Sequence, residues 1–144
     1  MVLTSAMSST APRSYRQVRA QSPCSSHDHV ASLPAPKFDA KGIARTETVR
    51  EEFDSKRQAI QVRVDFAPGA SFPKHSHPGV EIAYVLSGAI EYEMDGKTIR
   101  LQAGESLYIP VGAMHSAKNI GSGSTSELAT YLVEKDKPIV VFDK

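Results

Sequence analysis

The chain has 144 residues, enough for one domain with a hydrophobic core and too few for two domains to be expected. Its 17 Lys and Arg residues nearly balance 16 Asp and Glu residues, which argues against nucleic acid or an anionic membrane surface as a partner. Cys24 is the only cysteine, which excludes an internal disulfide and a cysteine metal cluster, and no apolar run approaches the roughly 20 residues that cross a bilayer.

The N-terminal segment differs in composition from the rest of the chain. All nine glycines lie at Gly42 or later, whereas residues 1–36 hold four prolines and eight serines. Because this segment has little apolar surface to bury, we expect residues 1–41 to form a disordered extension. We also expect a cytoplasmic protein, since no secretory signal is visible.

Two features of the extension resemble functional signals. Arg13, Arg16 and Arg19 precede the first acidic residue, as in an organelle transit peptide, but we favour an ordinary tail and leave organelle targeting open. The segment His27-Asp28-His29 has the spacing of a metal motif, yet no glycine or proline turn frames it. We therefore expect these two histidines to be solvated.

Residues 42–144 have the sequence pattern of an all-β domain, in which short apolar or alternating runs are separated by turn signals of glycine, proline and Asp-Gly. Ile60 to Phe66 alternates apolar and polar residues, which predicts a half-buried strand. No segment has a sustained helical period. Further strands are predicted at Val80–Leu86, Ser106–Ile109, Ala113–Asn119, Glu127–Glu134 and Pro138–Phe142.

A β-hairpin is the clearest local prediction. Asp95-Gly96 separates Ile90–Met94 from Lys97–Leu101, and a two-residue turn at this point fixes the pairing of the two strands. The predicted pairs are Tyr92 with Ile99, Ile90 with Leu101, and Glu91 with Arg100. Apolar residues then share one face of the hairpin and opposite charges share the other. Many short strands of this kind suggest a sandwich, a barrel or a jelly roll.

Two segments framed by glycine and proline carry the candidate functional residues. His75 and His77 are two residues apart, so on a strand they project to the same side, about 6.6 Å apart at the backbone. Glu81 interrupts an apolar strand, where a carboxylate is costly to bury unless it is paired, hydrogen-bonded or bound to a metal. His115 lies in the second segment, so only the fold can bring it to the others.

The two segments resemble the paired motifs of the cupin superfamily. The first reads G-x5-H-x-H-x3-E-x6-G from Gly69 to Gly88, and the second reads G-x5-P-x-G-x2-H-x3-N from Gly104 to Asn119. Every defining position matches, and residues 89–103 separate the motifs. The resemblance implies a double-stranded β-helix, or jelly-roll barrel, over residues 42–144.

The resemblance also implies a metal site. In metal-binding cupins, the residues at the positions of His75, His77, Glu81 and His115 hold one divalent transition metal ion, which can be iron, manganese, zinc, nickel or copper. We favour iron or manganese here. No residue is assigned a catalytic role, and Asn119 is expected to support either the loops or the surroundings of the site. Cupins commonly form homodimers, and Ile139–Phe142 offers a run that can pair at a sheet edge.

These ligands predict a small enzyme of the dioxygenase type that acts on a compact molecule with vicinal oxygen atoms. Alternatives are a metal-dependent isomerase or decarboxylase, a binding module that holds a small ligand or metal without turnover, and a barrel in which zinc is only structural. Strand parity places Ala83, Val85, Ala113 and Ala117 beside the ligands, which predicts an apolar cavity. Of the strand tyrosines, Tyr84 is predicted to face away from it.

Overall fold

The structure is a computed structural model that describes residues 35–144. Residues 1–34 of the predicted extension, which was expected to reach residue 41, lie outside the described residues, and they include His27-Asp28-His29. Within the described part all regular structure is β, as predicted, and this part contains no helix that is long and apolar enough to cross a membrane. The ten strands are β1 (Ile43–Glu52), β2 (Arg57–Phe66), β3 (Ser71–Ser76), β4 (Gly79–Ser87), β5 (Ala89–Met94), β6 (Lys97–Gln102), β7 (Ser106–Ile109), β8 (His115–Asn119), β9 (Thr125–Glu134) and β10 (Val141–Phe142).

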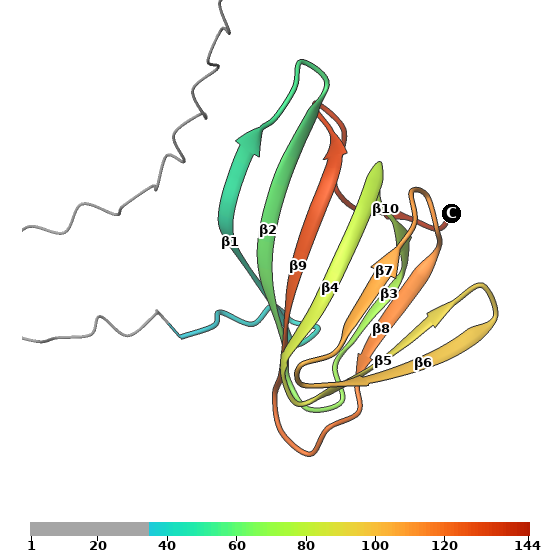
Figure 1. The fold of residues 1–144 in the computed structure, drawn as a ribbon. Coiled ribbons are helices and arrows are strands. Elements are labelled where there is room, and N and C mark those ends of the chain that lie inside the picture. The colour runs from blue at the N-terminus through green and yellow to red at the C-terminus, as the bar shows by residue number, and fades with distance from the viewer. Residues whose placement is uncertain (1–34) are drawn as a thin grey trace, which may run out of the picture. The chain divides into compact units, whose positions relative to one another are not determined.

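The strands form two five-stranded antiparallel sheets. One sheet has the order β1-β2-β9-β4-β7 and the other has the order β10-β3-β8-β5-β6. Figure 1 shows β1, β2, β9 and β4 next to one another, in agreement with the pairing of their backbones. Consecutive strands repeatedly change from one sheet to the other, which is the connectivity of a jelly roll and confirms the predicted fold class.

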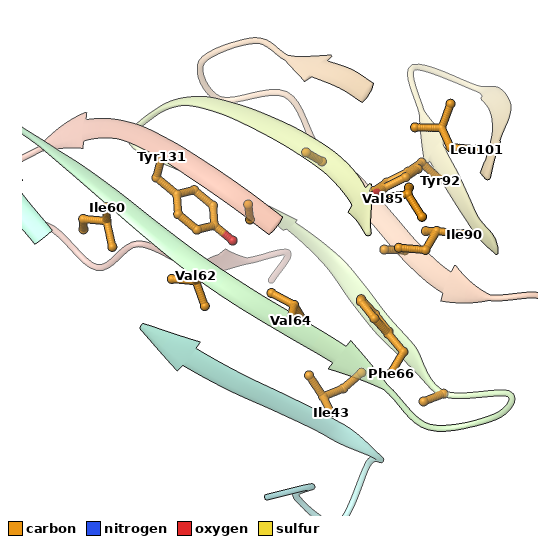
Figure 2. Packing of buried hydrophobic residues seen from close by; sticks show 14 of the residues in the cluster. Ile43, Ile60, Val62, Val64, Phe66, Val85, Ile90, Tyr92, Leu101 and Tyr131 are labelled. Atoms are coloured by element: carbon orange, nitrogen blue, oxygen red, sulfur yellow. The ribbon is translucent and has the colours of Figure 1, made fainter. Parts of the chain in front are cut away.

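The core lies between the two sheets. Val62, Val64 and Phe66 of β2 are buried at every second position, as their alternation predicts, although β2 begins three residues before the predicted strand. From the second sheet, Ile90 and Tyr92 of β5 belong to the same cluster, and Figure 2 shows these side chains. The apolar face of each sheet is thus buried against the other.

The predicted hairpin has the predicted register. Tyr92 pairs with Ile99, Ile90 with Leu101, and Glu91 with Arg100. Asp95 and Gly96 both have positive φ, 52° and 71°, which is the backbone of the two-residue turn that twists in the same sense as the strands. Local turn chemistry was therefore sufficient to determine this part of the fold.

One strand, β1, was missed in the sequence. Beyond Ile43 and Ala44, all but one residue of β1 is exposed, so the strand has no alternation to recognise and forms by pairing with β2 along its length. The predicted strand from Ala113 begins instead at His115, because Ala113 donates its N–H to the Pro110 carbonyl in a turn.

The C-terminal run is a shorter strand than predicted and it pairs within the chain. Val141 is opposite Ser76 and Phe142 is opposite His75, so β10 forms the edge of the second sheet beside β3. Ile139 lies outside this strand and packs against the core. The run therefore covers the edge of the strand that carries His75.

A buried polar network joins the two sheets at one end of β8. Asn119 is 2% exposed, and its side chain bonds to the carbonyls of Phe66, Ala67 and Gly123, the amide of Gly121 and the hydroxyl of Thr125. Gly88 packs on the same hydroxyl with φ of 78°, and a Cβ atom there would collide with it. Asn119 and Gly88, one motif residue from each segment, therefore have a structural role in this network.

Candidate metal centre

The four predicted ligands converge between the two sheets. His75 near the end of β3 is directly opposite His115, the first residue of β8, while Glu81 comes from β4 in the other sheet. His77 lies just beyond the end of β3, so the predicted continuous strand through both histidines is one residue too long. Each of the four residues is at most 5% exposed, and one ligand atom from each lies within 4.8 Å of the others.

A bulge in β3 aims the first histidine inward. Phe72 is opposite Ala117 and His75 is opposite His115, so two residues of β3 face a single residue of β8. In a regular strand, residues three apart point to opposite faces, but here the Phe72 and His75 rings meet edge to face at 4.6 Å. The extra residue therefore places both rings in the interior.

Backbone carbonyls fix the orientation of all three imidazole rings. The Nδ1 atoms lie 2.7 Å from the Pro73 carbonyl oxygen for His75, 2.6 Å from that of Ile139 for His77, and 2.9 Å from that of Ala113 for His115. A carbonyl only accepts a hydrogen bond, so each Nδ1 carries the proton. In the neutral ring each Nε2 then has a lone pair available for a metal, and the carbonyls hold it in place.

Two buried atoms of the cluster lack a hydrogen-bond partner. They are His77 Nε2 and Glu81 Oε2, which face each other at 2.8 Å. With its proton on Nδ1, a neutral His77 cannot donate to the carboxylate, so two acceptors point at the same position. His115 Nε2 also lies 3.3 Å from this oxygen. A cation is the group that satisfies all of these acceptors, and the donor set of three imidazoles and one carboxylate suits a divalent transition metal.

The protonation states at neutral pH agree with this assignment. Burial alone would raise the pKa of Glu81, but the adjacent His115 and His77 imidazoles outweigh it and lower the pKa to about 2. Burial lowers the pKa of His75 to about 4, so this ring is neutral. For His115, burial lowers the pKa, but the adjacent Glu81 carboxylate and the Ala113 carbonyl outweigh burial and raise the pKa overall.

A small pocket lies beside three of the four ligands, His75, Glu81 and His115. Its free space is about 10 Å³, roughly the volume that one water molecule needs. The lining includes the predicted neighbour Ala117, whereas Ala83 and Val85 are fully buried within the core and Ala113 precedes β8 in a turn. Nothing in the sequence indicated that the remaining residues line this pocket. They are Arg45, Val64, Phe66, Phe72, Tyr92, Glu127 and Tyr131.

The prediction of an apolar cavity was therefore wrong. Glu127 is 5% exposed and accepts a hydrogen bond from the Tyr92 hydroxyl, and Arg45 reaches the Tyr131 hydroxyl at 3.4 Å. Burial and the charge of Glu81 raise the pKa of Glu127 to about 8, so its carboxyl carries a proton at neutral pH. Of the residues that strand parity predicted, only Ala117 lines the pocket, and the polar groups come from other strands, β1, β5 and β9.

The strand tyrosines divide between the interior and the surface. Tyr92 and Tyr131 are at most 2% exposed, and the Tyr131 ring lies 4.8 Å from the ring of His77. Tyr84 is 41% exposed, as its parity with Glu81 predicts, and Tyr108 is also exposed. Glu127 had a detectable signal in the sequence, because it precedes alternating apolar residues of β9 in the same way that Glu81 interrupts β4.

Comparison with known proteins gives one family. Residues 62–131 match a family model described as a cupin domain. Among curated proteins, oxalate oxidase GF-2.8 of Triticum aestivum is 34% identical over 89 residues, which cover 56% of this chain and 39% of that protein. The matched part spans about a third of the length of the curated relatives, between 34% and 39%.

Solved structures give the same architecture. KdgF from Halomonas sp. matches with a TM-score of 0.58 and 26% identity, over 72% of this chain and 90% of that chain. A recombinant oxalate oxidase in complex with glycolate matches with a TM-score of 0.58 and 27% identity, over 72% of this chain and 56% of that chain.

Proposed function

This chain belongs to the cupin superfamily, and we propose that it is a metal-dependent enzyme of the dioxygenase type that acts on a compact small molecule with vicinal oxygen atoms. The observation that carries the proposal is the convergence of three fixed Nε2 atoms and the unpartnered Glu81 Oε2 beside a small pocket. Iron or manganese bound by these four ligands would supply redox and Lewis-acid chemistry at its remaining positions.

The residues of the chain prepare the site for such a substrate. The carbonyls that bind the three Nδ1 atoms keep the imidazole rings oriented, and Glu81 offsets part of the charge of a divalent ion. Phe72, Tyr92 and Tyr131 line the pocket and exclude bulk water. The free space of about 10 Å³, room for about one water molecule, argues against a large substrate.

The relatives support oxidase-type chemistry. Oxalate oxidases occur among both the curated relatives and the solved structures that match this chain, one of the latter in complex with glycolate. Their names describe activity on a small, oxygen-rich molecule, which is the substrate class that this pocket favours.

Glu127 favours a second candidate function, a metal-dependent isomerase or decarboxylase. These reactions need a proton to be delivered without any net oxidation. Glu127 lies in the wall of the pocket, is protonated at neutral pH, and is held by the Tyr92 hydroxyl. It is positioned as a proton donor beside the ligands, a role that an oxidation does not require.

Elemental analysis combined with oxygen uptake tests the proposal. The purified protein is expected to hold about one iron or manganese ion per chain and to consume oxygen with a member of a panel of catechols, thiols, diketones and small 2-hydroxy or dicarboxylic acids. Conversion of a panel compound without oxygen uptake would favour the second candidate. Bound zinc with no turnover would contradict both and favour a binding module or a structural site.

We also propose a homodimer, in line with the sequence-based expectation. The outer face of β4 and its neighbours β7 and β9 supports it, because Ile82, Tyr84, Leu86, Tyr108 and Leu132 are each at least 39% exposed there. Exposed apolar groups of this kind mark interaction surfaces. Light scattering on the chain and on the variant Ile82→Glu would test this, since a monomeric wild type contradicts the proposal.

A further inference from the structure

Arg45 occupies the outer side of the pocket beside the candidate metal ligands. Among the residues that line this pocket, Arg45 is exposed, Phe72 is half-buried and the others are buried. Its guanidinium carbon lies 5.8 Å from the centre of the Phe72 ring and 5.9 Å from the centre of the Tyr131 ring. Contacts with two aromatic rings at this range favour a cation and keep its side chain over the pocket.

Arg45 differs from the other arginines of residues 35–144 in having no carboxylate partner. The others are ion-paired at 3.0 Å or less, namely Arg50 with Glu47, Arg57 with Asp54, Arg63 with Asp65, and Arg100 with Glu91. The side chain of Arg45 makes one hydrogen bond in this part of the chain, a long one of 3.4 Å to the Tyr131 hydroxyl. Its guanidinium therefore retains donors that can bind a ligand in a forked geometry.

The charge of the pocket favours an anion. Its acidic groups are Glu81 and Glu127, and its cations are Arg45 and the metal ion that the ligands would hold. Even if both carboxyl groups are ionised, a divalent ion and Arg45 leave the pocket with excess positive charge. Such an excess in a partly enclosed site attracts anionic ligands more strongly than it would in open solvent.

We propose that Arg45 is a specificity-determining residue that pairs with a carboxylate of the substrate, so that the enzyme acts on small carboxylic acids whose other oxygen is directed toward the His75, Glu81 and His115 side of the pocket. This inference rests on the proposed function, since it assumes that the pocket beside the metal ligands is the substrate site. It goes further by naming the charge of the substrate and the side chain that recognises it.

A purely structural role for Arg45 makes different predictions. The charge of Arg45 acts on Glu127 to lower its pKa, so Arg45 is a distant counter-charge to that carboxyl group. Under this role, loss of the guanidinium would change the stability of the protein and its dependence on pH. It would not change the preference of the pocket for a carboxylate over a neutral molecule of the same shape.

Calorimetric titration of the metal-loaded protein with glycolate and with its neutral amide, glycolamide, separates the two roles. These two probes are compact and keep the vicinal oxygens. The wild type is expected to bind glycolate at least about tenfold more tightly than glycolamide, as expected for a hydrogen-bonded charge pair. Arg45→Gln is expected to lose most of this preference, and Arg45→Lys to keep part of it. Arg50→Gln, a change of an ion-paired arginine on the same strand, should leave it intact.

Elemental analysis of every titrated sample distinguishes failure of this inference from failure of the proposed function. If the variants hold the metal and Arg45→Gln keeps the full preference for glycolate, the assignment of Arg45 is wrong while the metal site stands. If the wild type prefers glycolamide or binds the two probes equally at full metal content, the assignment of a carboxylate substrate is also wrong. If the wild type holds no metal, the proposed function itself fails.

Discussion

Both ends of β8 carry buried polar side chains, but only at one end do these side chains have all their hydrogen-bond partners. At one end, the Asn119 side chain has five hydrogen-bonding neighbours, and both its oxygen and its nitrogen are satisfied. At the other end, His115 and its neighbours leave His77 Nε2 and Glu81 Oε2 without a partner. Both ends are equally buried, so burial alone does not separate them.

The difference identifies which end is built for binding. A satisfied buried network stabilises one arrangement of the chain and has no capacity left for a ligand. Unsatisfied acceptors that converge on one position cost stability unless a cation occupies it. The Asn119 end is therefore a structural joint between the sheets, and the His115 end is suited to binding a cation, at some cost to the stability of the metal-free fold.

The largest expected effect of a substitution at fixed pH is on stability at the Asn119 end. Asn119→Ala leaves several buried backbone groups without partners, and we expect the free energy of unfolding to fall by at least about 3 kcal/mol. Urea unfolding measures this. Lys118→Ala, an exposed neighbour on β8, should change it by less than about 0.5 kcal/mol. The metal content of the folded fraction of Asn119→Ala should be unchanged. Loss of the metal would contradict the assignment of separate roles to the two ends.

The next effect concerns the other end of β8. Glu81→Gln preserves the shape of the side chain and removes its charge. At a free Mn²⁺ concentration of about 100 times Kd, the wild type should gain about 2.7 kcal/mol of unfolding free energy, and the variant should gain almost none. Without metal, the two proteins should differ little, because the unpartnered charge is removed. Paired urea titrations with and without Mn²⁺ measure both, and a full gain in the variant would contradict the site.

The third effect tests Glu127 on β9, whose carboxyl lines the pocket at the His115 end. With a pKa of about 8 in the folded state, above its usual 4.5, Glu127 holds a proton that the unfolded chain has released between these values. Stability of the metal-free protein should therefore fall as pH rises through this range, by up to about 1.4 kcal/mol per pH unit.

Glu127→Gln should remove this contribution, and unfolding measured from pH 5 to 8 will show whether the slope flattens. Glu134→Gln changes an exposed residue of the same strand and serves as the control. An unchanged slope in Glu127→Gln would mean that the carboxyl is ionised in the folded protein, and the support for the second candidate function would then be lost.

Local sequence patterns predicted the elements that depend on neighbouring residues. The Asp95-Gly96 turn fixed the hairpin register, and alternation placed Glu81 on the inner face of β4 with Tyr84 outside. The ligand set followed from the likeness of the two segments to cupin motifs, because no local rule brings His115 to His75. The structure places all four side chains together.

The sequence did not reveal the features that depend on pairing between distant strands. β1 is mostly polar and becomes a strand by pairing with β2, so Arg45 gave no sign that it reaches the pocket. The β3 bulge that turns Phe72 inward depends on its alignment with β8. Glu127 was placed on a strand, but alternation gives the face of a side chain and not the groups it meets across the barrel.

Metal stoichiometry tests the central claim most directly. Elemental analysis of the purified wild type should give about one transition metal ion per chain. His77→Ala should lose most of this metal while circular dichroism shows the β structure retained. The matched control is the double variant His27→Ala with His29→Ala, which removes the other His-x-His segment and should keep the metal. Full metal content in folded His77→Ala, or its loss in the control, would contradict the account.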